Sequence, residues 1–135
     1  TGRYGMVIPS FVRQALTGSP ITVFGDGTQS RSFTYVSDVV GAMVRLMDSD
    51  QTLGQVYNIG NGKELTMLEL ARIVKEMTSS SSEIVLVPYD EAYEEGFEDM
   101  PRRVPDISKI RKAIGYEPTL GIRAILQKVI DYEKK

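Results

Sequence analysis

Two arginine positions have the clearest potential for ligand chemistry. Arg31 lies in an extended pattern shortly after a Gly25-Asp26-Gly27 turn, and Arg103, with its neighbour Arg102, lies in an aperiodic loop behind an acidic run. A guanidinium group binds phosphate oxygens through two parallel N–H groups. Taken singly, each arginine more often belongs to a solvated surface. Together, Arg31 and Arg103 predict a clamp on a diphosphate.

Four aromatic side chains accompany these arginines, namely Phe24, Phe33, Tyr35 and Tyr93. A nucleobase can stack on an aromatic ring or lie against an exposed strand backbone. Each of these rings is more commonly part of a core than of a ligand site. The residues alone therefore indicate a domain with a candidate anion site and leave the ligand open.

Residue types exclude several kinds of site. The chain has no histidine and no cysteine, which removes histidine acid–base chemistry, thiolate chemistry and the usual zinc sites. It has no G-x-G-x-x-G dinucleotide motif, no P-loop and no Tyr-x-x-x-Lys pair. Nothing marks Glu94, Glu95 and Asp99 as more than solvated charges. We therefore expect neither a metal site nor cofactor-binding residues in this chain.

Composition places the chain among ordinary globular domains. Its 135 residues fit one domain, and an apolar content of 41% allows a buried core. The net charge of −2 gives no bulk attraction to nucleic acid or to anionic membranes. No apolar run approaches the roughly 20 residues of a membrane span. We expect no nucleic-acid or membrane partner, and the lack of cysteine fits a reducing, cytoplasmic location.

The helices that must position these residues follow from apolar periodicity. This spacing predicts five helices, over residues 8–16, 39–47, 67–74, 107–114 and 122–130. Gly18 ends the first helix, Ser37 or Asp38 caps the second, and Thr66 with Glu69 forms a capping box at the third. The buried face of the second helix is predicted to carry Val39, Val40, Met43, Val44 and Met47.

The strands are predicted from short β-rich runs, which are residues 21–24, 31–36, 56–59 and 84–87. The serine-rich residues 78–82 predict a solvated loop, and the acidic, aperiodic residues 89–105 predict a longer one. Four or five helices with three or four short strands indicate an α/β fold with a small mixed sheet. We expect a single domain over residues 1–135.

Longer motifs in the chain are more specific than single residues. Residues 20–38, PITVFGDGTQSRSFTYVSD, resemble a signature in the C-terminal half of the extended short-chain dehydrogenase family. Four later pieces match in the same order: Tyr57–Gly60, the capped helix at Thr66, Arg103–Lys109 and Gly115–Pro118. The resemblance covers essentially the whole chain. It implies the C-terminal, nucleotide-sugar-binding part of an NAD-dependent epimerase or dehydratase similar to UDP-glucose 4-epimerase.

The resemblance implies a role for each candidate residue. The strand Thr22–Phe24 would offer its backbone to the uracil of a UDP-sugar, with Phe24 beside the base. Arg31 would bind the diphosphate, and Arg103 would reach the diphosphate or sugar from the opposite side. Relatives that decarboxylate a UDP-uronate give the matching arginine a catalytic role, which makes Arg103 the candidate for direct chemistry. The implied substrate-binding set is Met6, Val7, Val23, Phe24, Arg31, Tyr93 and Arg103.

The family's NAD-binding glycines and its Tyr-x-x-x-Lys pair lie upstream of the point where this chain begins. The resemblance therefore implies that NAD binds to an N-terminal domain absent from this chain, and that the chain alone has no turnover. In the full-length enzyme, which we expect to be a homodimer, NAD would oxidise C4 of the sugar. We also expect an exposed apolar surface where the cofactor domain docks.

The fate of the resulting 4-keto sugar is not fixed by these residues. A UDP-sugar 4-epimerase is the leading interpretation. The alternatives are part of a UDP-glucuronate decarboxylase or of a dTDP-glucose 4,6-dehydratase. Two further classes stay open, a non-catalytic nucleotide-binding module and a plain interaction domain that has kept the fold without the ligand.

Overall fold

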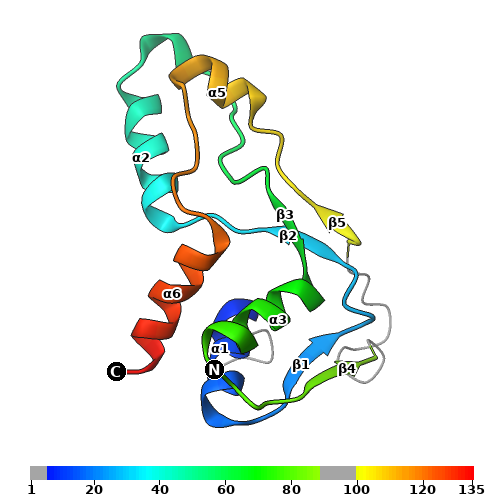
Figure 1. Ribbon diagram of the computed structural model, residues 1–135. Helices are drawn as coiled ribbons and strands as arrows, with labels where there is room; N and C mark the ends of the chain where they lie inside the picture. Colours follow the sequence, from blue (N-terminus) through cyan, green and yellow to red (C-terminus); the bar gives the residue numbers. More distant parts are fainter. Residues whose placement is uncertain (1–5, 89–99) are drawn as a thin grey trace.

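The computed structural model of the chain describes residues 6–88 and 100–135. Figure 1 shows the described helices and strands in chain order. The helices are α1 (Val7–Thr17), α2 (Val36–Met47), the short 3₁₀ helix η1 (Asp50–Thr52), α3 (Met67–Met77), α5 (Ser108–Ile114) and α6 (Ile122–Glu133). The strands are β1 (Ile21–Phe24), β2 (Ser30–Ser32), β3 (Glu64–Thr66), β4 (Ile84–Val87) and β5 (Arg102–Arg103).

The strands form two small sheets, where the sequence predicted one. In the first, β1 pairs with β4 in parallel. In the second, β2 lies in the middle, antiparallel to β3 and parallel to β5. The predicted α/β class, with helices around a small amount of mixed sheet, is confirmed. In the described part of the chain, no helix combines the length and apolarity needed to cross a membrane.

The main core is made by α1, α3 and α6 packed together over β1 (Figure 1). Apolar residues at helical spacing in each helix, with the two inward residues of β1, fill it. Gly18 adopts the left-handed conformation that ends α1, as predicted. The buried members are Ile8, Phe11, Val12, Ala15, Ile21, Val23, Met67, Leu70, Ala71, Val74, Ile125, Leu126 and Ile130.

The first turn of α3 is tied to the turn that joins β1 to β2. The predicted capping box is present: Glu69 N–H donates to Thr66 Oγ1, and Thr66 N–H donates to Glu69 Oε2. These hydrogen bonds, chiefly the one from the Thr66 backbone, lower the pKa of Glu69. Leu68 N–H donates to the Gly27 carbonyl at 3.1 Å. A Cβ on Gly27 would lie 3.0 Å from Leu68 Cβ, so this close approach requires glycine.

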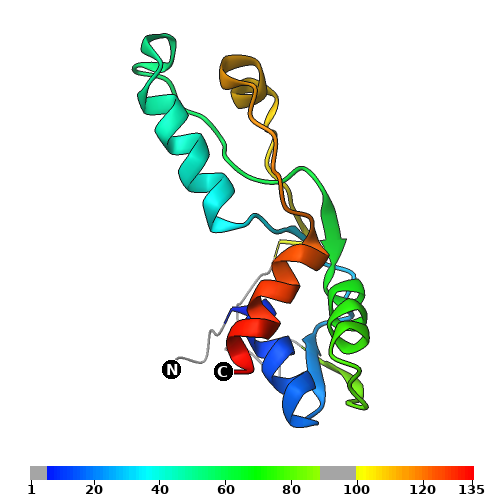
Figure 2. The same cartoon turned by 60° about the vertical axis from the view of Figure 1, so that its left-hand side comes forward.

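A second apolar cluster lies on the arm formed by α2 and α5, which stands apart from the main core (Figure 2). Its buried members are Ala42, Ile107, Ile110 and Tyr116. The Tyr116 hydroxyl donates to the Gly60 carbonyl at 2.9 Å and so ties this cluster to the chain that leads into β3. Burial, and then the negative charge of Asp38, raise the pKa of Tyr116.

Asp38 does not cap its own helix, contrary to the prediction. The helix α2 begins at Val36, two residues before Asp38, and no side chain caps its N-terminus. The buried Asp38 carboxylate instead accepts hydrogen bonds from Thr119 N–H at 3.1 Å, Thr119 Oγ1 at 2.6 Å and Leu120 N–H at 3.3 Å. Asp38 therefore joins the base of the α2–α5 arm to the segment that leads into α6.

The predicted buried face of α2 is also wrong. The buried side of the helix holds Asp38 and Ala42. Val40, Met43 and Val44 are about half exposed, and Met47 is 81% exposed. The helix packs mainly on α5 and η1, so its apolar stripe lacks a partner within residues 6–88 and 100–135. Periodicity identified the apolar side correctly but not its burial.

Two strand predictions also need correction. The extended run predicted over residues 31–36 is the short β2, because Val36 already begins α2. Residues 56–59 form no strand in the structure. They are held instead by hydrogen bonds with a later segment, since Lys109 Nζ donates to the Val56 carbonyl at 2.9 Å and Asn58 Nδ2 donates to the Asp106 carbonyl at 3.4 Å. Moreover, β5 lies within the predicted loop 89–105.

The serine-rich segment after α3 is a packed connection and not the predicted solvated loop. Ser80 Oγ donates to the Ala15 carbonyl at 2.7 Å, and Ser82 Oγ donates to the Gln14 carbonyl at 3.4 Å. Ser82 is buried. The accepting carbonyls belong to the last turn of α1, where carbonyl groups have no N–H partner within the helix. The segment thus satisfies the end of α1 before the chain enters β4.

The structure predicts that Asp38→Ala is strongly destabilising. The substitution leaves two backbone amides and a hydroxyl without their acceptor, which we expect to lower the free energy of unfolding by about 3 kcal/mol. Denaturant unfolding measures the loss. Asp48→Ala is the matched control, because Asp48 follows the same helix and is exposed. Equal unfolding midpoints for the two variants would contradict the role of Asp38.

Candidate functional site

Arg31 and Arg103 are direct neighbours in the structure. They are register partners on β2 and β5, which run in parallel. Side chains of register partners project from the same face of a sheet with their Cβ atoms about 5 Å apart. Like charges in this arrangement repel each other, and an anion between them offsets the repulsion. The predicted proximity of the two arginines is therefore met, although they lie far apart in the sequence.

The environment of Arg31 favours strong electrostatic binding. On its other side, Arg31 has Leu65 of β3 as its register partner, and Leu65 packs against the main core. Arg31 is half-buried, and its Nη1 donates to the Ser30 carbonyl at 2.7 Å. A cation at the edge of an apolar core attracts an anion more strongly than one in open water. Arg103, by contrast, is exposed.

The opposite face of the same sheet carries a polar latch that the sequence analysis missed. Glu64 Oε2 accepts from Arg102 Nε at 2.7 Å and from Ser30 Oγ at 3.3 Å. These contacts join β3 and β5 across the central strand β2. Because β5 has only two residues, this latch helps to hold Arg103 in register with Arg31. Glu64 carried no signal in the sequence, since it belongs to β3, a three-residue strand too short to show a period.

The end of β1 places a second group of predicted residues close to the start of β2. The Val23 side chain is fully buried in the core, so only its backbone is available to a ligand. Phe24 is 38% exposed, and its carbonyl accepts from Gln29 Nε2 at 2.7 Å. Gln29 Oε1 is buried and has no hydrogen-bond partner among residues 6–88 and 100–135. Gln29, which the sequence analysis quoted only as part of a motif, therefore fixes the end of β1 against the turn.

The turn between β1 and β2 is held by its own side chains. Asp26 Oδ1 accepts from Thr28 Oγ1 at 2.7 Å and from Thr28 N–H at 2.9 Å. These two bonds, the side-chain bond first, lower the pKa of Asp26. Gly25 and Gly27 both have positive φ, as a tight turn of this kind requires. The turn therefore reaches β2 with a defined geometry.

The remaining candidates lie elsewhere. Met6 precedes α1, is 79% exposed, and its carbonyl accepts from Ser10 N–H at 3.2 Å. Val7 is the first residue of α1 and packs against the main core. Tyr93 lies outside the described residues. The geometry thus brings together Arg31 and Arg103, with Phe24 at the far end of the connecting turn.

The two arginines can bind an anion, but they do not provide groups for hydride or proton transfer. Two adjacent guanidinium groups offer several N–H donors with the forked geometry that suits a diphosphate. The chain has no dinucleotide-binding glycine motif and no Tyr-x-x-x-Lys pair, so its residues do not fit NAD.

The α/β fold of the chain matches the C-terminal part of nucleotide-sugar epimerases of the extended short-chain dehydrogenase class. Residues 4–129 match the family described as GDP-mannose 4,6 dehydratase. The chain belongs to this family. The predicted resemblance is therefore confirmed.

Relatives by sequence are mainly decarboxylases. The chain is 40% identical over 131 residues to UDP-N-acetyl-alpha-D-glucosaminuronate decarboxylase of Bacillus cytotoxicus, covering 97% of the chain and 40% of that protein. It is 48% identical over 120 residues to UDP-glucuronic acid decarboxylase 6 of Arabidopsis thaliana, covering 88% of the chain and 32% of that protein. The chain thus spans well under half the length of these relatives.

Relatives by structure include epimerases with bound nucleotide sugars. UDP-glucose 4-epimerase of Thermotoga maritima, with UDP-glucose, superposes with a TM-score of 0.83 at 30% identity, covering 98% of this chain and 41% of that one. UDP-glucuronic acid 4-epimerase of Bacillus cereus, with UDP-glucuronic acid and NAD, gives a TM-score of 0.83 at 27% identity, covering 96% and 40%. In both cases the chain matches well under half of the longer protein.

The arginine pair predicts that inorganic pyrophosphate stabilises the fold. At ten times its dissociation constant, pyrophosphate adds about 1.4 kcal/mol, a rise in melting temperature of about 3 °C. Arg103→Gln removes one of the two cations and should abolish most of this rise, whereas Arg72→Gln on α3 should keep it. Thermal unfolding with and without pyrophosphate measures both. An equal rise in the two variants would rule out the pair as the site.

Proposed function

We propose that this chain binds the UDP-sugar substrate of an NAD-dependent nucleotide-sugar enzyme. The observation that carries the proposal is the register pairing of Arg31 with Arg103, which places the two arginines opposite each other on neighbouring strands. A diphosphate has the charge and the oxygen spacing to bind both. The nucleoside then extends toward the end of β1, where Phe24 is partly exposed and can lie against the base.

Arg103 is the candidate for direct chemistry within this site. It is exposed, whereas Arg31 is half-buried, so Arg103 has the freedom to contact the sugar as well as the phosphates. If the sugar is a uronic acid, a guanidinium beside its carboxylate fixes the acid group by a forked pair of hydrogen bonds. The same cation stabilises negative charge that builds up on the sugar during reaction.

We infer that the substrate is a UDP-uronic acid, with decarboxylation favoured over epimerisation as its fate. The relatives at 40% and 48% identity are decarboxylases of UDP-linked uronic acids, while the epimerase structures are 27% to 30% identical. NAD, bound by residues outside this chain, would supply the oxidation at C4. The carboxylate is attached to C5, the carbon beside the new C4 ketone, so the oxidised sugar would be a β-keto acid. Cleavage of the C5–carboxylate bond would release CO₂ and leave an enolate, which takes up a proton at C5.

Calorimetric titration with UDP tests the binding role. Each of Arg31→Ala and Arg103→Ala should weaken UDP binding about 10- to 100-fold, because each removes a charge-assisted contact to phosphate. Arg72→Ala removes the same charge from an exposed position on α3 and should bind UDP like the wild type. UDP binding that is unaffected in both site variants would overturn the proposal. If the wild-type chain binds UDP and a UDP-sugar with equal affinity, the result would instead favour a simple nucleotide-binding module.

We further propose that the exposed stripe of α2 docks against the NAD-binding part of the full-length enzyme. The stripe consists of Val36, Val40, Met43, Val44 and Met47, all at least half exposed. A contiguous apolar face of this kind is unusual for a surface that stays in water. The relatives are much longer than this chain and so have a further part available to cover the stripe.

Binding of an apolar fluorescent dye tests this surface. The wild-type chain should bind the dye, and the double variant Val40→Asp with Met43→Asp should lose most of the signal, because both side chains lie on the exposed face of α2. Tyr132→Asp is the control, since Tyr132 is exposed on α6, away from the stripe. Dye binding that stays unchanged in the double variant would place the apolar surface elsewhere.

A further inference from the structure

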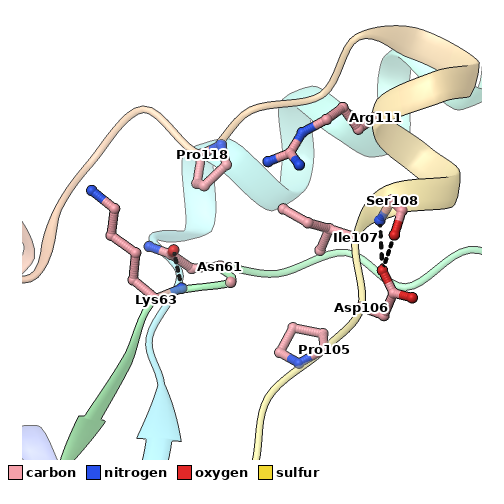
Figure 3. Close-up of a pocket in the computed structure, with 9 residues that line it drawn as sticks. Asn61, Lys63, Pro105, Asp106, Ile107, Ser108, Arg111 and Pro118 are labelled. Atoms are coloured by element: carbon pink, nitrogen blue, oxygen red, sulfur yellow. Dashed lines mark hydrogen bonds between the residues drawn. The ribbon is translucent and has the colours of Figure 1, made fainter.

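A polar pocket lies between the loop before β3 and the start of α5, at residues that the nucleotide site does not use (Figure 3). Its volume is about 390 Å³, within the range of small-molecule sites. One wall is rigid, because Gly60 packs so tightly on Pro105 that a Cβ at Gly60 would lie 2.5 Å from the proline ring. The pocket therefore has a fixed shape and is not a gap between loose loops.

The floor of this pocket carries a buried side-chain amide with an unused donor. Asn61 is only 5% exposed, and its Oδ1 accepts from Lys63 N–H at 3.0 Å. That bond fixes the orientation of the amide. Nδ2 has no partner within residues 6–88 and 100–135, and it lies on the pocket side of the loop, near the extended Lys63 (Figure 3). Because Nδ2 is not among the fully buried unpaired atoms of the described chain, its N–H groups can donate to water or to a ligand in the pocket.

Two cations line the pocket near this amide. Lys63 Nζ makes no ion pair in the described chain. Arg111 Nη2 donates to Glu117 Oε2 at 2.9 Å, and its Nε pairs with the other oxygen, which leaves Nη1 directed toward Pro118. The bond to Glu117 raises the pKa of Arg111. An oxyanion can therefore meet a lysine, an arginine and an amide at one end of the pocket.

The other end of the pocket suits hydroxyl groups. Asp106 and Ser108 line it across from Lys63 (Figure 3). Asp106 Oδ1 accepts from both Ser108 N–H and Ser108 Oγ, so Oδ2 stays available as an acceptor. The hydrogen bonds from Ser108 lower the pKa of Asp106 and keep it a carboxylate. A hydroxyl can donate to this carboxylate, whereas a second anionic group would be repelled by it.

We propose that this pocket binds a small hydroxylated oxyanion, with its acid group on Asn61, Lys63 and Arg111 and a hydroxyl on Asp106. A sugar acid and a sugar phosphate share this chemistry. None of its proposed binding groups is a candidate residue of the nucleotide site, although Lys63 directly precedes β3 and Asp106 comes shortly after β5, the two strands that flank β2 and its Arg31.

Nuclear magnetic resonance titration of the ¹⁵N-labelled chain tests the pocket, because the side-chain NH₂ of Asn61 gives its own pair of signals. Glucuronate and inorganic phosphate are the two probes, and neutral glucose is the control ligand. Either probe should shift the Asn61 NH₂ signals, whereas glucose should not. A response to glucuronate alone identifies a carboxylate site that needs hydroxyl groups, and a response to both probes identifies a general oxyanion site.

Variants separate this site from the nucleotide site. Lys63→Gln should weaken probe binding about fivefold, because it removes an exposed charged donor without disturbing the fold. Lys112→Gln, an exposed lysine on α5 that does not line the pocket, should bind like the wild type. Arg31→Ala should also leave the shifts unchanged. Absence of any shift, an equal shift with glucose, or loss of the shift in Arg31→Ala would each overturn the proposal.

Discussion

The free backbone amides at the start of α3 are the constraint on which the site depends. Met67 and Leu68 donate to the carbonyls of Gln29 and Gly27, while Thr66 and Glu69 satisfy each other. The accepting carbonyls belong to the turn that enters β2, so the helix start determines where β2 begins. Thr66 is also the last residue of β3, so the hydrogen bonds at the start of α3 set the register of β3 against β2. In that register, Leu65 of β3 lies beside Arg31 on one edge of β2, and β5 pairs with the other edge.

The rest of the described chain divides into a closed part and an open part. The three helices over β1 cover one another and leave the main core complete. The α2–α5 arm has a small cluster of its own. Hydrogen bonds that the Asp38 carboxylate accepts, and one that the Tyr116 hydroxyl donates, connect the arm to the rest of the described chain. Hydrogen bonds to a buried carboxylate are directional, so they fix the angle of the arm where apolar packing alone would not.

Sequence reasoning succeeded where a pattern is long or a residue type is decisive. The spacing in α1 and α6 and the Thr66–Glu69 box predicted these helices with starts within one residue of the structure, while α3 and α6 each run three residues past their predicted ends. It failed for β3 and β5, because strands of two or three residues have no measurable period. It failed for α2 because periodicity shows which side is apolar and not whether anything covers it. The pairing of Arg31 with Arg103 was predictable only from the joint chemistry of two cations, and the latch at Glu64 was not predictable at all.

The parallel pairing of β2 with β5 joins residues that are distant in the chain. Bringing positions 31 and 103 together in an unfolded chain costs about 4 kcal/mol of loop-closure entropy, and a two-residue strand offers few hydrogen bonds in return. A nucleotide whose phosphates touch both arginines then acts as a non-covalent crosslink between the two ends of this loop. Binding of such a nucleotide would therefore stabilise the paired state of this sheet edge, to an extent that rises with the ligand concentration.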